Sequence, residues 1–164
     1  GDKKTSKQLL QEFTAKTYDE IREAKENGEL IGWSTSNFPK EICQTFDLKI
    51  MYPENHSAAV AAKKGAIPFC EKAEGLGYSM DFARMLVLIS ALFEEDFGFG
   101  LDVPAPDFLC VSNNICTTVI KWYENLSHNL DIPFLLLDIP YNTDGYYTAN
   151  KTSYIKAQLQ YIID

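Results

Sequence analysis

Cys116 is the first candidate for chemistry, because its thiol closes a short polar stretch that follows an apolar segment. We expect it in the first turn of a helix that Asn113 or Asn114 caps. Backbone N–H groups and the helix dipole at such a position favour the thiolate, the form that binds a metal or attacks as a nucleophile. The alternative is a small buried core cysteine, and position alone favours that alternative.

Glu54 is the second candidate, since it follows Pro53 at the end of another apolar segment and precedes a helical pattern. It could exchange a proton with a ligand in a cleft as a general acid or base. It could instead be an exposed carboxylate that stabilises a helix N-terminus, and position alone favours this simpler role. His56 could act as a base, although a lone histidine near a helix start is more often structural.

Other polar side chains accompany these residues in the sequence. Ser34 and Ser36 follow an earlier apolar segment, and each could hold a substrate by a hydrogen bond or cap a helix. With Ser34 and His56, Asn55 is predicted to lie on the substrate-binding side of a site. The sequence has no G-x-G-x-x-G after its first predicted strand, no P-loop and no G-x-S-x-G motif, so none of these common sites is predicted.

Helical and extended patterns alternate along the chain. Helices are predicted over 6–27, 38–45, 56–64, 68–74, 79–94, 115–130 and 148–163, and strands over 30–34, 48–52, 108–112 and 134–139. Strands separated by helices predict an α/β fold with a parallel, Rossmann-like sheet flanked by helices on both sides. On length, residues 1–164 are expected to form a single domain.

The apolar patterns also predict which residues are buried. In the first helix, one face carries Leu10, Phe13, Ile21 and Ala24. The segment 134–139 is continuously apolar, so we expect this strand to be buried on both faces.

Ligands of open parallel sheets bind beyond the carboxyl ends of the strands. The loops that follow the predicted strands contain residues 34–37, 53–56, 112–116 and 138–141. If the strands are neighbours, these loops line one edge of the sheet, and the candidate residues gather there.

Composition narrows the class of protein. The 164 residues carry a formal net charge of −8, which disfavours nucleic acid as a partner. No apolar run is long enough to span a membrane and no signal peptide is visible, so a cytoplasmic location is expected. The four cysteines, Cys43, Cys70, Cys110 and Cys116, form no C-x-x-C pair and fit neither a zinc finger nor a disulfide-rich secreted domain.

Several stretches together resemble the large subunits of the 2-hydroxyacyl-CoA dehydratases, which are related to the ATP-dependent benzoyl-CoA reductases. They are residues 32–36 with 39–41, then 51–59, 73–79, 110–116 leading into 121–124, and 138–141. The combination of Asn-Asn-Ile-Cys with Lys-Trp-Tyr-Glu is the most specific part.

The resemblance implies one α/β domain of a larger, two-domain subunit that pairs with a homologous second subunit. It also implies a [4Fe-4S] cluster held by cysteines from both domains, and a separate ATP-dependent iron–sulfur activator protein that injects one electron. The implied reaction removes water from an (R)-2-hydroxyacyl-CoA to give an enoyl-CoA.

The implied chemistry explains why a cluster and an electron-donating activator would be needed. The β-hydrogen of such a substrate is not acidic, and ordinary base catalysis contributes only about 10²–10⁴-fold. One added electron gives a ketyl radical anion, which expels the hydroxyl group and leaves an enoxy radical with an acidic β-proton. A cluster iron with an open coordination site can polarise the thioester carbonyl.

Position by position, the resemblance makes Cys116 a cluster ligand, Ser36 a residue that holds the substrate, and Glu54 the residue for proton transfer or hydroxyl departure. Family members usually have a further cluster cysteine after the Gly-Tyr-Ser segment, but here Phe82 runs directly into Ala83-Arg84. Cys110 and Cys70 are possible substitutes, although neither lies where the family pattern puts a ligand.

Two other functions stay open. A relative of the benzoyl-CoA reductases would use the electron to reduce an acyl-CoA. A degenerate subunit would keep the fold without catalysis, having lost a cluster ligand.

Overall fold

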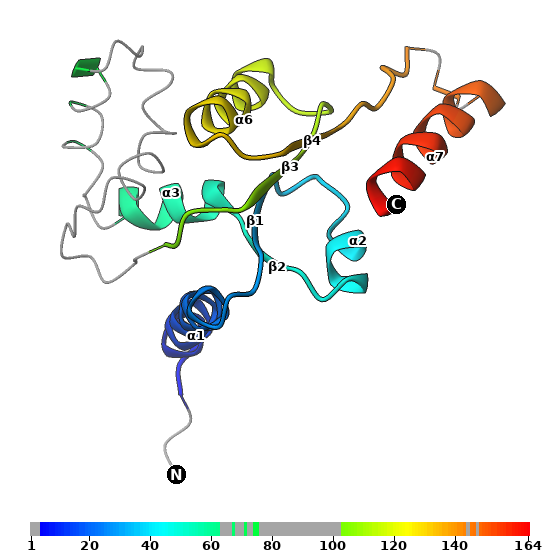
Figure 1. Ribbon diagram of the computed structural model, residues 1–164. Helices are drawn as coiled ribbons and strands as arrows, with labels where there is room; N and C mark the ends of the chain where they lie inside the picture. Colours follow the sequence, from blue (N-terminus) through cyan, green and yellow to red (C-terminus); the bar gives the residue numbers. More distant parts are fainter. Residues whose placement is uncertain are drawn as a thin grey trace.

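The computed structural model describes residues 4–62, 67, 71, 74–75, 103–143, 145–146 and 148–164, without the side chains of residues 59, 60 and 62. Figure 1 shows the elements in chain order: α1 (Ser6–Glu26), β1 (Ile31–Ser34), α2 (Lys40–Thr45), β2 (Lys49–Met51), α3 (Pro53–Ala62), β3 (Phe108–Ser112), α6 (Thr117–Leu130), β4 (Phe134–Leu137) and α7 (Ala149–Ile163). The helices predicted over 68–74 and 79–94 lie outside the described residues, apart from residues 71 and 74.

The four strands form one parallel sheet in the order β2-β1-β3-β4. The chain leaves β1 toward β2 and later returns to the other side of β1 as β3, so the direction of winding changes between β1 and β3. The predicted α/β fold with a parallel, helix-flanked sheet is confirmed. The carboxyl ends of β2, β1 and β3 therefore lie side by side, as the sequence predicted for the candidate loops.

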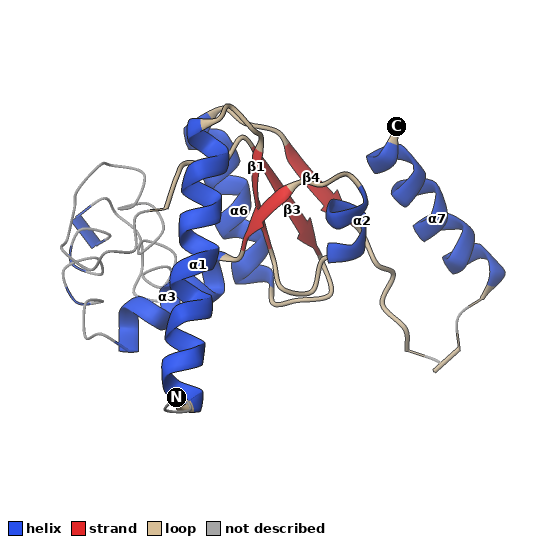
Figure 2. Cartoon of the chain, turned by 90° about the horizontal axis from the view of Figure 1, so that it is seen from below, coloured by secondary structure: helices blue, strands red, loops and turns tan. Residues whose placement is uncertain are grey.

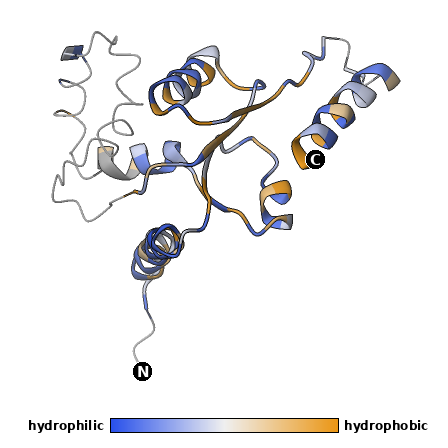
Figure 3. Cartoon of the chain, viewed as in Figure 1, coloured by the Kyte–Doolittle hydropathy of each residue, from blue (hydrophilic) through white to orange (hydrophobic). Residues whose placement is uncertain are grey.

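Helices cover both faces of the sheet. On one face, α1 and α6 pack against the strands around Trp33, Leu109 and Val111. On the other face, α2 and α7 pack around Cys110 and Leu137. The hydropathy colours of Figure 3 follow this arrangement, with hydrophobic residues along the strands and in α2.

The close packing of β1 depends on Gly32. A Cβ atom there would lie 2.4 Å from the Phe108 ring and 2.6 Å from the Ile50 side chain. Any side chain at this position would overlap both of these side chains. Glycine therefore lets Phe108 of β3 and Ile50 of β2 pack over the backbone of β1.

The apolar face predicted for α1 is only half right. Ile21 and Ala24 are buried as expected, together with Tyr18, but Leu10 and Phe13 are 69% and 70% exposed. Figure 2 shows the reason: the N-terminal half of α1 runs past the sheet, and only the C-terminal half covers β1 and β2.

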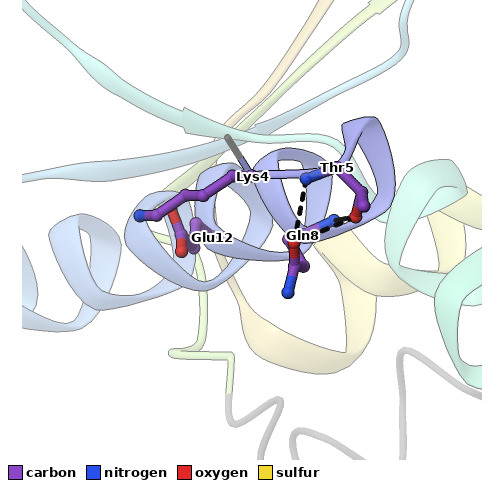
Figure 4. A network of polar contacts seen from close by, with 4 residues as sticks. All are labelled: Lys4, Thr5, Gln8 and Glu12. Atoms are coloured by element: carbon purple, nitrogen blue, oxygen red, sulfur yellow. Dashed lines mark hydrogen bonds and ion pairs between the residues drawn. The ribbon is translucent and has the colours of Figure 1, made fainter. Parts of the chain in front are cut away.

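The protruding start of α1 is held by local polar contacts (Figure 4). Thr5 and Gln8 form a capping box, in which the Gln8 N–H donates to Thr5 Oγ1 over 3.3 Å and the Thr5 N–H donates to Gln8 Oε1 over 2.8 Å. Lys4 also pairs with Glu12 at 2.6 Å. The capping box satisfies the backbone N–H groups of Thr5 and Gln8 at the start of the helix.

The strand predicted over 134–139 is not buried on both faces. β4 ends at Leu137, and Leu136 is 39% exposed. Within the described residues β4 is the edge strand of the sheet, and one of its two faces leaves Leu136 partly open to solvent. In the same part of the chain, no helix is both long enough and apolar enough to cross a bilayer.

Candidate functional site

The loops after β1 and β3 are joined directly at the carboxyl edge of the sheet. The Thr35 N–H donates to the Cys110 carbonyl over 3.0 Å, which continues the strand pairing past the end of β1. The Ser112 N–H points back to Thr35 Oγ1 at 3.4 Å. Thr35 is fully buried, so the loop that carries Ser36 starts from a fixed position.

Two asparagines extend this connection. The side-chain N–H of Asn37 donates to Asn114 Oδ1 over 2.7 Å, and the Ser112 hydroxyl donates to the same oxygen over 2.8 Å. The shared acceptor holds the β1 loop against the β3 loop. Asn37 and Asn114 were not predicted as site residues, although their place after two strands was the signal that could have found them.

Glu54 reaches this edge from the neighbouring strand β2. Helix α3 begins at Pro53, three residues earlier than predicted, because proline is well suited to the first helical position. Glu54 is therefore in the first turn of α3, and its Oε2 accepts the Ser36 N–H over 3.1 Å. Its other oxygen, Oε1, is buried without a hydrogen-bond partner. The structure thus brings Ser36 and Glu54 together.

Cys116 is the N-cap of α6 and is exposed. The prediction that it lies in the first turn of a helix capped by Asn113 or Asn114 is wrong. Asn113 binds the Asp138 carboxylate and accepts the Ile139 N–H over 2.6 Å, and Asn114 binds the β1 loop. Both carboxamides are occupied by tertiary contacts, so neither caps α6.

Cys110 lies in the opposite face of the sheet from α6. It is 2% exposed and packs near Cys43 in the core that α2 and α7 cover. A hydrogen bond with the Cys43 thiol, together with burial, raises the pKa of the Cys110 thiol well above its ordinary value. Cys110 is therefore protonated at neutral pH, which suits a core residue better than a thiolate ligand. Cys70 lies outside the described residues.

Two of the residues predicted to bind substrate, Ser34 and His56, have structural partners in the fold. Ser34 is buried, and its hydroxyl donates to the Thr35 carbonyl over 3.1 Å. His56 is also buried, with its Nδ1 2.9 Å from the Tyr18 hydroxyl, so it joins α3 to α1. Asn55 is exposed and lines a cavity of about 310 Å³ between α1 and the end of β2.

Tyr123 is a further residue that the sequence did not single out, because it belongs to the apolar stripe of α6. It is 1% exposed, and its hydroxyl has no hydrogen-bond partner. Burial and, next, the charge of Glu54 raise the pKa of Tyr123 well above its ordinary value. The phenol therefore stays protonated and is a hydrogen-bond donor.

A complete metal site is not present in the described part of the chain, where no three His, Cys, Asp or Glu side chains gather around one point. At this edge, Cys116 can supply one thiolate to a metal. The ligands of a complete cluster would have to include residues outside the described part of the chain.

Comparison with known proteins agrees with the resemblance. The family model "2-hydroxyglutaryl-CoA dehydratase, D-component" matches residues 35–164. The chain is 45% identical over 160 residues to the (R)-2-hydroxyisocaproyl-CoA dehydratase alpha subunit of Clostridioides difficile, covering 98% of this chain and 39% of that protein. It is 47% identical over 155 residues to the (R)-phenyllactyl-CoA dehydratase alpha subunit of Clostridium sporogenes, covering 94% and 38%.

A reductase is similar at lower identity. One of the benzoyl-CoA reductase subunits of Thauera aromatica is 29% identical over 168 residues, covering 96% of this chain and 37% of that protein. The chain thus spans about two fifths of the length of these relatives. With 130 of its 164 residues matched by the family model, the chain belongs to the family of the 2-hydroxyglutaryl-CoA dehydratase D-component.

Proposed function

We propose that this chain is part of a subunit of an (R)-2-hydroxyacyl-CoA dehydratase, which removes water from its substrate to give an enoyl-CoA. The contact between the Ser36 N–H and Glu54 Oε2 carries the proposal, because it fixes a carboxylate against a serine with an exposed side chain at the edge of the sheet where ligands bind in such folds. The names of the relatives at 45% and 47% identity support the reaction class.

The two residues divide the work on the substrate. Ser36 uses its backbone N–H to hold Glu54, so its exposed hydroxyl is left to hold the substrate. The Ser36 N–H holds the Glu54 carboxylate at Oε2, and the remaining lone pairs of that carboxylate are left for proton exchange with the substrate. Glu54 then takes the β-proton, and this proton together with the hydroxide already expelled makes up the water that is removed.

We further propose that Cys116 is one ligand of a [4Fe-4S] cluster. Its thiol is exposed at the start of α6, and it lies at the same edge of the sheet as Ser36 and Glu54. Such a cluster supplies one-electron chemistry and an open iron site that polarises a carbonyl oxygen. Because Cys110 is buried beside Cys43, the proposal places Cys116 rather than Cys110 at the cluster.

The electron accounts for the removal of an unactivated β-proton. One electron added to the thioester carbonyl gives a ketyl radical anion, which loses hydroxide to form an enoxy radical. Loss of the β-proton to Glu54 and return of the electron complete the enoyl-CoA, so the electron is recycled and only water is removed. The proposal therefore includes an ATP-dependent iron–sulfur activator as electron donor and a homologous second subunit as partner.

An acyl-CoA reductase is the second candidate, supported by the similarity to the benzoyl-CoA reductase of Thauera aromatica. It would consume electrons in every turnover, whereas the dehydratase recycles one. The full-length subunit, purified without oxygen with its partner, is incubated with activator, ATP, a reductant and an (R)-2-hydroxyacyl-CoA. Enoyl-CoA formed with catalytic amounts of electrons supports the dehydratase. Product formed only with stoichiometric reductant, from an aromatic acyl-CoA, contradicts it.

A further inference from the structure

Two buried polar atoms near the proposed site lack partners and complement each other chemically. Tyr123 Oη can donate a hydrogen bond, and Glu54 Oε1 can accept one. Neither atom is exposed to solvent, although buried polar groups in folded proteins are nearly always hydrogen-bonded. Such a pair therefore calls for an explanation beyond core packing.

Tyr123 packs in the same core cluster as Met51, which is the last residue of β2 and lies three positions before Glu54. Helix α6 begins at the carboxyl edge of β3 and runs back along the sheet, and long helical side chains point toward the helix N-terminus. A side chain of α6 that follows this rule points toward the carboxyl edge of the sheet, where Glu54 lies. Burial raises the pKa of Tyr123 most, and the charge of Glu54 raises it next, which agrees with this placement.

The two oxygens of Glu54 have different surroundings. Oε2 is held by the Ser36 N–H at 3.1 Å, whereas Oε1 is buried with no donor. A carboxylate held at one oxygen can still rotate, and a second donor would remove that freedom. Tyr123 has a buried hydroxyl without a partner, and burial and then the charge of Glu54 raise its pKa.

We propose that Tyr123 is a positioning residue for Glu54, and that its hydroxyl donates to Glu54 Oε1 through one bound water molecule. This inference rests on the proposed function, in which Glu54 moves a proton. Held at Oε2 by a backbone N–H and at Oε1 by the bridge, the carboxylate presents its remaining lone pairs in one orientation to the substrate. Positioning of this kind raises turnover more than it raises substrate affinity.

Tyr123→Phe tests the inference, because it removes the hydroxyl and keeps the ring that fills the core. The full-length enzyme, with its partner subunit and activator, is compared with Tyr161→Phe, which removes a hydroxyl from an 80% exposed side chain of α7. We expect Tyr123→Phe to keep iron content and the thermal midpoint, to change KM by less than about twofold, and to lower kcat by about tenfold or more. A normal kcat, or a loss of kcat that matches a loss of iron or of folded protein, overturns the inference.

A crystal structure of the intact enzyme gives a readout that does not depend on activity. We expect one water within about 3.2 Å of both Tyr123 Oη and Glu54 Oε1, absent in Tyr123→Phe. The water bridge is overturned if the Tyr123 hydroxyl is surrounded by protein atoms alone, with no water between it and Glu54 Oε1.

Glu54→Gln separates this inference from the proposed function. Normal turnover of Glu54→Gln removes the proposed role of Glu54 itself. Loss of turnover in Glu54→Gln together with normal turnover in Tyr123→Phe overturns the positioning role alone.

Discussion

The backbone N–H of Ser36 and the carboxylate of Glu54 meet at 3.1 Å, although they follow different strands of the sheet. Ser36 lies in the loop after β1, and Glu54 lies in the first turn of α3, directly after β2. The contact exists because β1 and β2 are parallel neighbours whose carboxyl ends reach the same edge. The contact places Ser36 and Glu54, which were separate candidates in the sequence, next to each other.

Glu54→Gln should keep the fold and the iron and lower turnover by about a hundredfold or more. The amide oxygen of glutamine can still accept the Ser36 N–H, but the side chain cannot take up a proton. Turnover of an (R)-2-hydroxyacyl-CoA by the activated full-length enzyme is the measurement. Glu41→Gln on the exposed face of α2 is the control, and equal activity of the two variants would contradict the assignment.

Cys116→Ala should remove cluster iron from the full-length enzyme without lowering its thermal midpoint in the iron-free state. The side chain is exposed and makes no capping hydrogen bond, so its loss leaves the packing of α6 unchanged. Iron and acid-labile sulfide are measured on protein purified without oxygen. Cys43→Ala is the matched control: it should lower stability, because the thiol is buried, and keep the iron. Full iron retention in Cys116→Ala would rule out the ligand role.

Gly32→Ala should destabilise the fold by about 1–3 kcal/mol, the usual cost of forcing extra atoms into a packed core. The new methyl group would overlap the Phe108 ring at 2.4 Å and the Ile50 side chain at 2.6 Å. The free energy of unfolding is measured by urea denaturation. Gly75→Ala, which has open space around the added Cβ, serves as the control. Equal midpoints for both variants would show that β1 tolerates a side chain there.

Asp107 should make the fold sensitive to acid. Burial acts to raise the pKa of its carboxyl, but the Ile31 N–H at 2.8 Å and Lys25 at 2.6 Å outweigh burial and lower it below the ordinary value. A carboxyl whose pKa is lower in the folded than in the unfolded state stabilises the fold above the unfolded pKa. That contribution is lost as the pH falls through the lower, folded pKa.

Asp107→Asn tests this contribution. The variant should lose about 1 kcal/mol of stability at pH 7, where the ion pair is formed, and the difference from the wild type should shrink below about pH 4. Urea unfolding at several pH values measures it. A difference in stability that stays constant with pH would mean that the charge of Asp107 does not contribute to the stability of the fold.

Local sequence patterns were sufficient for the strands and for the edge where the candidates gather. The strand predicted over 108–112 matches β3, because an apolar run bounded by proline and asparagine leaves little choice of boundary. The start of α6 was missed, because Asn113 and Asn114 look like helix caps in the sequence. In the structure, both are bound by partners that are distant along the chain.

The role proposed for Tyr123 could not be read from the sequence for the same reason. A tyrosine on the apolar stripe of a helix looks like an ordinary core residue. Only the fold shows that its hydroxyl is unpartnered. Only the fold shows, too, that the charge of Glu54, 69 positions earlier in the chain, adds to burial in raising the pKa of Tyr123. Such pairings depend on which strands become neighbours, and periodicity carries no information about that choice.

The strand order has a consequence for how such an enzyme can change over evolution. Glu54 follows β2 and Cys116 follows β3, and the loop of the central strand β1 touches both neighbouring loops through Ser36 and Asn37. Under the proposed roles, mutations in the β2 loop can therefore alter proton transfer by Glu54 while leaving Cys116 in place, and mutations in the β3 loop can do the converse. Mutations in the β1 loop disturb both at once, so selection on that short segment should be the strictest.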